Sequence, residues 1–317
     1  MAGPQQSTFT VDRESLKNLK DKTVLITGGS SGIGLATAQL VAGLSESNNL
    51  VILDRSPPPY TLNVPPKRIL YKECNIHDWK SQRAAFEAAV ERFGGLDAVY
   101  VNAGISEYKD QFFNNDLDSD GKLAQPDHRV LDIDLNAAAD TVKLAIHFMR
   151  QHGGGGGSIV ITTSLAGYLA SAGAPMYSAA KHGVVGLMRA LKNDTAKVGI
   201  AMSVVAPGIT VTPILSQGQS RGSDPEVWAK EMAGLGVPIN RPESIALAVG
   251  FLMNEGMAGN GKGIFVQADR MWDLERGMAG TRELWMGKEM LDLFRGGRKA
   301  PLFAATVEEE PGRAAKL

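Results

Sequence analysis

The chain has 317 residues, and 44% of them are hydrophobic, which is enough for one large α/β domain or two smaller ones. The formal net charge of -1, without a long block of one sign, excludes a nucleic-acid-binding surface built on charge. The only cysteine, Cys74, excludes an intramolecular disulfide. It fits a reducing, cytoplasmic compartment, and no stretch approaches the ~20 apolar residues of a membrane span.

The start of the chain has the order of a nucleotide-binding unit. Residues 1–20 are polar and predict a loosely held arm. Residues 23–27 (TVLIT) predict a buried strand, and a glycine-rich turn at 28–34 leads into a segment with helical spacing. Residues 50–54 (LVILD) predict a second strand that ends in an aspartate. Strand, glycine turn, helix, strand and acid together indicate a βαβ unit.

Strands and helices continue to alternate along the rest of the chain. Residues 56–66 contain five prolines, so we expect an irregular loop there instead of a crossover helix. Residues 209–240 are rich in glycine, proline and serine and predict a mobile substrate loop. The remaining expected strands are 68–71, 96–101, 159–163, 200–205 and 263–267, and the expected helices are 78–93, 126–150, 176–198, 242–254 and 278–294.

Seven expected strands without an internal linker predict a single doubly wound α/β domain. The sheet of this Rossmann-type domain should be mostly parallel, with helices on both faces. We assign the domain to residues 21–275, with residues 1–20 as an N-terminal arm and 276–317 as a C-terminal helix and flexible tail.

The glycine turn is a candidate phosphate site. Its glycines let the backbone approach a pyrophosphate, and the helix that follows directs free amides and its positive end at the phosphates. The acid expected in such a unit, Asp54, follows Gly34 by 20 residues. The candidate binding residues in the turn are Gly28, Ser30, Ser31, Gly32, Ile33 and Gly34.

Asp54 and Arg55 bear on the choice of cofactor. The carboxylate of Asp54 would accept hydrogen bonds from the adenosine ribose hydroxyls and would repel a 2′-phosphate, which favours NAD. Arg55 argues for NADP, because a guanidinium can bind that phosphate, or is a solvated loop cation. We expect NAD, because Asp54 holds the strand-end position that faces the ribose.

A second group of residues has the character of a proton-transfer site. Tyr177 and Lys181 share one face of the expected helix, because they are four residues apart. Ser164 follows the strand at 159–163. A tyrosine is a weak base at neutral pH, but a neighbouring lysine and the positive nicotinamide of an oxidised cofactor favour its phenolate.

These residues, in this order, resemble a classical short-chain dehydrogenase/reductase, and the resemblance covers about residues 20–270. The run after Tyr177 and the ending GIFVQADRMW are similar to the hydroxyprostaglandin-dehydrogenase-like branch and related enzymes of secondary metabolism. The motifs that carry the resemblance are TGGSSGIG at 27–34, NAG at 102–104, Asn136, Ser164, the Tyr177 to Lys181 motif and PGITVT at 207–212.

The resemblance implies a role for each matching position. Tyr177 would exchange the substrate proton, Ser164 would hold the substrate oxygen, and Lys181 would also hold the nicotinamide ribose. Asn136 would position a water that relays the proton, although a structural hydrogen bond is the alternative for this residue. Further cofactor contacts would come from Asn75, Ile76, Asn102, Ala103, Gly104, Pro207, Gly208, Ile209, Thr210 and Thr212.

The function implied is an NAD-dependent oxidoreductase that interconverts a secondary alcohol and a ketone. Tryptophan and methionine in 209–240 and 278–296 favour a lipophilic or polycyclic small molecule, although an ordinary core or subunit interface explains them equally. The resemblance also implies a homodimer or homotetramer. The alternatives are a non-catalytic NAD(P)-binding regulator and, less favoured, epimerase or dehydratase chemistry.

We expect no metal site. The histidines show no ligand spacing. The run 116–121 (DLDSDG) matches the start of an EF-hand loop, but Asp127 stands where the bidentate glutamate is needed. A solvated polar loop is therefore expected there.

Overall fold

The computed structural model describes residues 8–152, 156–217 and 224–296. It divides into two compact units, residues 6–275 and a smaller unit that contains residues 276–296, and each is described by itself. The tail expected at 297–317, the first part of the expected N-terminal arm and part of the expected substrate loop lie outside the described residues.

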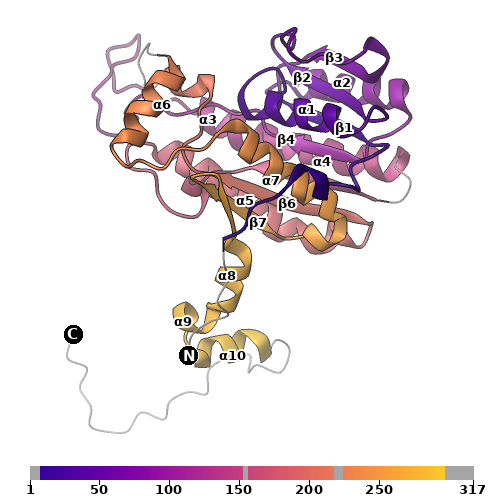
Figure 1. Cartoon of the computed structure of the whole chain (residues 1–317). Helices are drawn as coiled ribbons and strands as arrows, with labels where there is room; N and C mark the ends of the chain where they lie inside the picture. The colour runs from indigo at the N-terminus through magenta and orange to yellow at the C-terminus, as the bar shows by residue number, and fades with distance from the viewer. Residues whose placement is uncertain (1–7, 153–155, 218–223, 297–317) are drawn as a thin grey trace, which may run out of the picture. The chain divides into compact units, whose positions relative to one another are not determined.

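An eight-stranded sheet runs through the larger unit in the order β3-β2-β1-β4-β5-β6-β7-β8 (Figure 1). All neighbouring strands are parallel except β7 and β8. The predicted doubly wound α/β class is thus confirmed. The strands are β1 Thr23–Thr27, β2 Asn49–Asp54, β3 Ile69–Glu73, β4 Ala98–Val101, β5 Gly157–Thr162, β6 Ile200–Pro207, β7 Gly263–Gln267 and β8 Arg270–Asp273.

Helices cover both faces of this sheet, because its central strands are apolar on both sides. On one face α1 (Gly32–Leu44) contacts α7 (Pro242–Glu255), over a buried cluster that includes Ile26 and Val249. On the other face α2 (Trp79–Phe93), α4 (Ala137–His152) and α5 (Pro175–Ala196) cover a second cluster, which includes Phe86, Met149 and Met188. This two-sided burial holds the ends of the parallel strands in register.

The eighth strand was not predicted. β8 returns antiparallel to β7 after a two-residue turn, in which Ala268 and Asp269 have φ values of 49° and 60°. Two positive φ angles are typical of the type I′ hairpin turn, which usually contains asparagine or glycine. The turn is hidden in the sequence because neither residue is a glycine.

The helix expected at 126–150 begins later and is irregular. It starts with α3 (Arg129–Leu131), passes through one π-helical turn, η3 (Asp132–Asn136), and continues as α4. The wider π turn shifts which side chains face inward relative to a regular α-helix. This shift matters for the site described below.

The N-terminal segment is packed from Phe9 on instead of being loose. Phe9 forms a backbone bridge to Met271, and η1 (Arg13–Ser15) follows. Leu16 and Leu19 are buried in the same cluster as the α1 and α7 side chains. These apolar side chains tie the segment to the domain.

The smaller unit consists of short helices. Where we expected one helix at 278–294, there are three, α8 (Leu274–Gly280), α9 (Arg282–Met286) and α10 (Lys288–Gly296). Gly287, at φ 77°, ends α9 in a conformation that disfavours other residues. Leu291 is buried, whereas several large apolar side chains of this unit are exposed.

Only short helical segments occupy the long connections. As predicted, residues 56–65 contain no helix, and only η2 (Pro66–Arg68) precedes β3. The others are η4 (Leu165–Gly167), η5 (Pro213–Gln217), α6 (Pro225–Gly234) and η6 (Gly256–Gly259).

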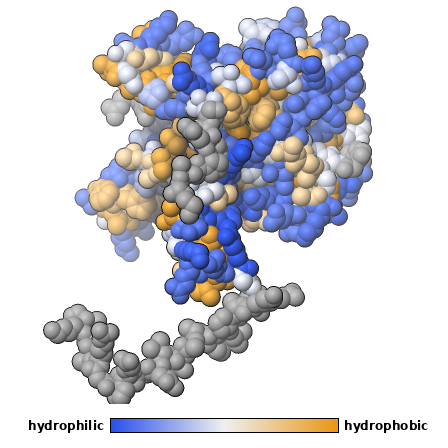
Figure 2. All heavy atoms as spheres, turned by 60° about the horizontal axis from the view of Figure 1, so that its bottom comes forward, coloured by the Kyte–Doolittle hydropathy of each residue, from blue (hydrophilic) through white to orange (hydrophobic). Residues whose placement is uncertain are grey.

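Figure 2 shows apolar patches on an otherwise largely hydrophilic surface. None of the described helices has both the length and the apolar character required to cross a membrane.

Candidate active site

A cleft of about 1050 Å³ opens at the carboxyl ends of the parallel strands. It is lined by residues that end or follow β1, β2, β4, β5 and β6. Strand order reverses between β1 and β4, and the crevice at such a switch point is where open α/β sheets bind ligands. The cleft therefore lies where the fold itself leaves space for a nucleotide.

The glycine turn between β1 and α1 is shaped for close backbone approach. Gly28 has a φ of 67°, and its amide donates to the Leu53 carbonyl at 2.7 Å. A Cβ on Gly34 would lie 2.0 Å from the Gly28 carbonyl oxygen, so no larger residue fits. The side chain of Ser31, the N-cap of α1, makes no capping hydrogen bond. The backbone amides of the first turn of α1 are thus available to donate hydrogen bonds to an anion, as a pyrophosphate site requires.

Asp54 is held at the end of β2, on the rim of this turn. Its Oδ2 accepts the Ser30 amide at 3.0 Å and its Oδ1 accepts the Ser56 amide at 3.3 Å. A carboxylate has about four acceptor positions, so it can still accept hydroxyl groups from the cleft. Arg55 is exposed and also borders the cleft. The residues present fit the adenosine end of a nicotinamide dinucleotide.

Two further segments complete the nucleotide side of the cleft. Asn102 Nδ2 donates to the carbonyls of Thr27 and Gly28 at 3.2 and 3.3 Å, which holds the segment after β4 against the glycine turn. Thr212 follows β6 and is buried beside Gly32. A Cβ added to Gly32 would lie 3.1 Å from the methyl group of Thr212. Segments far apart in sequence thus converge on one turn.

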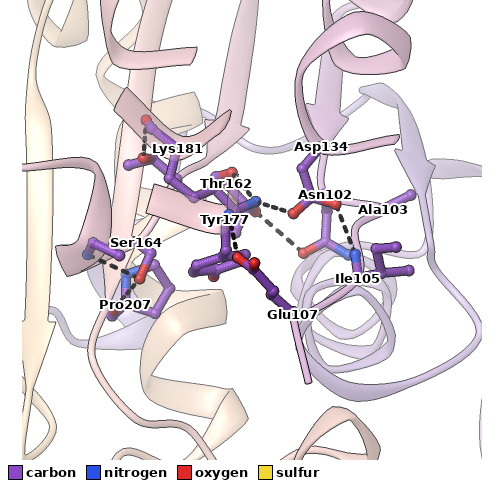
Figure 3. A network of polar contacts seen from close by, with 12 residues as sticks. Asn102, Ala103, Ile105, Glu107, Asp134, Thr162, Ser164, Tyr177, Lys181 and Pro207 are labelled. Carbon is purple, nitrogen blue, oxygen red and sulfur yellow. Dashed lines mark hydrogen bonds and ion pairs between the residues drawn. The ribbon is translucent and has the colours of Figure 1, made fainter. Parts of the chain in front are cut away.

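The side of the cleft where we expect proton transfer, the reactive side, is built from β5 and α5. Ser164 follows β5, its Oγ accepts the Ala166 amide at 3.1 Å, and its hydroxyl donates to the Pro207 carbonyl at 3.5 Å. Tyr177 lies in the first turn of α5, and Lys181 Nζ lies 5.4 Å from the centroid of its ring. All three side chains border the cleft, and Figure 3 shows them with their polar contacts.

Lys181 forms a buried ion pair. Its Nζ lies 3.0 Å from Asp134 Oδ2, and the two side chains are 5% and 1% exposed (Figure 3). Asp134 Oδ1 accepts the Ile105 amide at 2.8 Å, and Lys181 also donates to the Thr162 carbonyl at 3.3 Å. Burial, the largest single effect, acts to lower the pKa of Lys181, but Asp134 and Tyr177 together outweigh it and hold the pKa above its usual value. The ammonium has three donors, so one is left for a ligand.

Asn136 does not join this group, contrary to our expectation. It is exposed, and its Nδ2 donates to Asp132 Oδ1 at 3.2 Å. Two positions along a helix are about 200° apart around its axis, so Asn136 points away when Asp134 faces Lys181. The carboxylate of Asp134 thus occupies the place beside the lysine, within the π-helical turn η3.

The structure brings most of the predicted residues to one cleft. Ser30, Gly34 and Asn136 do not line it, although Ser30 and Gly34 shape the turn. The predicted residues that line it are Gly28, Ser31, Gly32, Ile33, Asp54, Arg55, Asn75, Ile76, Asn102, Ala103, Gly104, Ser164, Tyr177, Lys181, Pro207, Gly208, Ile209, Thr210 and Thr212.

The polar residues of the cleft that were not predicted from the sequence include Asp134, Glu107 and Tyr108. Glu107 is buried, and its Oε2 accepts the Tyr177 amide at 2.9 Å. The Tyr108 hydroxyl donates to the Ile214 carbonyl at 2.6 Å, which joins the two sides of the cleft, and burial raises its pKa. Both residues lie in a segment that reads as a polar loop, and no local pattern marks them.

The EF-hand-like run forms a tight turn instead of a cation loop. Asp118 Oδ1 accepts the amides of Asp120 and Lys122 at 2.9 and 3.0 Å, and Leu117 bridges Leu123. Within residues 8–152, 156–217 and 224–296, no group of three or more histidine, cysteine, aspartate or glutamate side chains is placed to hold a metal ion.

Comparison with known proteins agrees with this geometry. Residues 22–221 match the family model of the short chain dehydrogenases. The chain is 30% identical to the short-chain dehydrogenase/reductase prx4 of Penicillium rubens, over 92% of this chain and 89% of that one. It is 29% identical to the 15-hydroxyprostaglandin dehydrogenase [NAD(+)] of Mus musculus, over 62% of this chain and 71% of that one.

A solved structure has the same fold. Levodione reductase superimposes with a TM-score of 0.65 at 28% identity, and the match covers 78% of this chain and 97% of that one. The likeness thus extends over nearly the whole of that protein.

Replacing Asp134 should reveal how strongly the ion pair supports the fold. Asp134→Ala leaves Lys181 buried without its anionic partner, so we expect the free energy of unfolding to fall by about 3–5 kcal/mol in urea titrations. The control is Asp194→Ala, which breaks a pair with Lys197 whose side chains are 71% and 74% exposed and should cost less than about 1 kcal/mol. Equal losses in the two variants would contradict a structural role for the buried pair.

Proposed function

The chain belongs to the short-chain dehydrogenase/reductase family of oxidoreductases, and we propose that it is an NAD-dependent enzyme that interconverts a secondary alcohol and a ketone. The observation that carries the proposal is the placement of Tyr177 beside the buried Lys181, in one cleft with Ser164 and the glycine turn. A proton-transfer group and a nucleotide cradle that share one cleft suit the oxidation of an alcohol.

Each residue of the reactive side has a defined task in this proposal. Ser164 Oγ holds the substrate oxygen against Tyr177, whose hydroxyl takes the proton during oxidation and returns it during reduction. Lys181 places its ammonium group 5.4 Å from the centroid of the Tyr177 ring. Bound NAD supplies the hydride acceptor. The remaining donor of Lys181 is available for the nicotinamide ribose.

Asp54 supports NAD over NADP. Its carboxylate is fixed by two backbone amides at the end of β2, on the cleft. A fixed negative charge there accepts ribose hydroxyls and repels a phosphate on the same ribose. Arg55 is exposed, and no contact with another residue in the described part of the chain aims it at that position. The mouse relative carries NAD(+) in its name, which is in keeping with this choice.

The substrate proposal is a small, largely lipophilic molecule. Leu169, Ala174, Ile214 and Leu215 give the substrate end of the cleft apolar walls. Apolar walls with few convergent polar groups are typical of sites for hydrophobic small molecules. A place in secondary metabolism is part of the same proposal.

The cellular compartment and the oligomeric state of the enzyme are also proposals. A free, buried cysteine, Cys74, supports a cytoplasmic location. A homodimer or homotetramer is in keeping with the family. The other candidate function, a non-catalytic NAD(P)-binding regulator, would need only the nucleotide side of the cleft. The placement of Ser164, Tyr177 and Lys181 together favours the enzyme.

The central role belongs to Tyr177. Tyr177→Phe removes the proton-exchanging hydroxyl and keeps the ring, so kcat for a secondary alcohol should fall by about 10²- to 10⁴-fold, measured by nicotinamide absorbance. The dissociation constant for NAD should change little. Tyr60→Phe, at a fully exposed position, is the control. A Tyr177→Phe enzyme with more than about one tenth of the original kcat would overturn the assignment.

The choice of cofactor can be tested at Asp54. Asp54→Ser removes the carboxylate charge, so NAD affinity should drop and NADP affinity should rise, which changes the ratio of the two dissociation constants by at least about tenfold. Fluorescence titration with each dinucleotide measures this ratio. Asp194→Ser, at an exposed site, should leave it unchanged. An unaltered preference in Asp54→Ser would contradict the role given to this residue.

A further inference from the structure

Glu107 places a second carboxylate at the reactive end of the cleft. Its side chain is 9% exposed, and Oε2 accepts the Tyr177 amide at 2.9 Å (Figure 3). Ala174, the N-cap of α5, cannot cap the helix with its own side chain. Glu107 therefore caps α5 from another part of the chain, and its negative charge lies at the positive end of the helix. This contact accounts for one of its two oxygens.

The other oxygen is unexplained by the protein. Oε1 is buried and has no hydrogen-bond partner among the described residues. Burying an acceptor without a donor is unfavourable, and more so for a carboxylate. Glu107 belongs to the lining of the cleft, together with Ser164 and Tyr177. Oε1 itself has almost no surface open to the cleft, so a donor bound in the cleft pairs with it after a small rotation of the carboxylate.

The surroundings limit the kind of donor. Leu169, Ile214 and Leu215 are apolar walls of the same cleft and cannot solvate a charged group. An anionic ligand would be repelled by Glu107, and an ammonium group would lose its hydration beside these apolar walls. A neutral hydroxyl group donates one hydrogen bond and tolerates apolar neighbours. The chemistry that fits is a hydroxyl on a mostly hydrocarbon skeleton.

We propose, on the basis of the function proposed above, that Glu107 determines specificity by accepting a hydrogen bond from a second hydroxyl group of the substrate. The substrate is then a diol or hydroxy-ketone on a lipophilic skeleton. One hydroxyl reacts at Tyr177 and the other is bound at Oε1 of Glu107. A site that binds a substrate hydroxyl discriminates strongly against an analogue that lacks it, because the protein acceptor is then left unpaired.

The test compares matched pairs of ligands. The cyclohexane-1,2-, 1,3- and 1,4-diols are each paired with their monomethyl ether, which keeps one oxidisable hydroxyl and removes the second donor. For each pair, kcat/KM with NAD is measured, together with the calorimetric dissociation constant for the NADH-loaded protein, which has no hydride acceptor and cannot oxidise the ligand. For at least one spacing, we expect the diol to be favoured by about 10- to 100-fold in both quantities.

Glu107→Gln is the decisive variant. It keeps the size of the side chain and one oxygen for the Tyr177 amide, but it turns the other end into a donor that can bind an ether oxygen. The preference for the diol should fall to about threefold or less. Glu91→Gln, at an exposed position of α2, should keep the original preference. Each preference is a ratio within one protein, so a modest loss of stability does not affect it.

The outcomes separate this inference from the function on which it rests. A diol preference that is equal in the original protein and in Glu107→Gln, or absent for every spacing in the original protein, overturns the role of Glu107. If no ligand is oxidised but the binding preference depends on Glu107, the proposed reaction fails and the hydroxyl site stands. If the ligands are oxidised but the preference for the diol does not depend on Glu107, the proposed reaction is supported and the hydroxyl site at Glu107 is contradicted.

Discussion

The buried pair of Lys181 and Asp134 is the interaction on which the reactive side depends. Opposite charges 3.0 Å apart in the interior are strongly coupled, and neither is easily buried alone. The pair joins α5 to the π-helical turn η3, and its remaining hydrogen bonds reach the end of β5 at Thr162 and the segment after β4 at Ile105. Four elements thus meet at one charge pair, which fixes the lysine beneath Tyr177.

The two halves of the cleft are built from different kinds of groups, backbone amides in one and side chains in the other. The nucleotide half is mostly backbone, because the glycine turn and the uncapped start of α1 present amides, and Asp54 is held there by the Ser30 amide. The reactive half is made of side chains held by contacts across long sequence separations. Glu107 caps the helix that carries Tyr177 from 70 residues away, and Tyr108 ties the same segment to Ile214. We therefore expect the loops to determine which substrate is bound.

This division explains what could be predicted from the sequence. The strand–turn–helix start, Asp54 and the Tyr177 to Lys181 spacing are local patterns, and the structure brings them to one cleft. Asp134 was missed because Asn136 matched a motif, whereas Asp134 is the buried residue of the π-helical turn. β8 was missed because its turn uses Ala268 and Asp269 at positive φ. Glu107 acts through a tertiary contact that leaves no local signal.

Direct detection of hydride transfer tests the central claim, that this cleft oxidises a secondary alcohol with NAD. The protein would be incubated with NAD and cyclic secondary alcohols that carry deuterium on the carbinol carbon, and the nicotinamide product examined by mass spectrometry and proton NMR. We predict deuterium at C4 of the reduced nicotinamide and the matching ketone in equal amount. Saturating NAD binding with no deuterium transferred from any alcohol would contradict this claim and favour a non-catalytic binding protein.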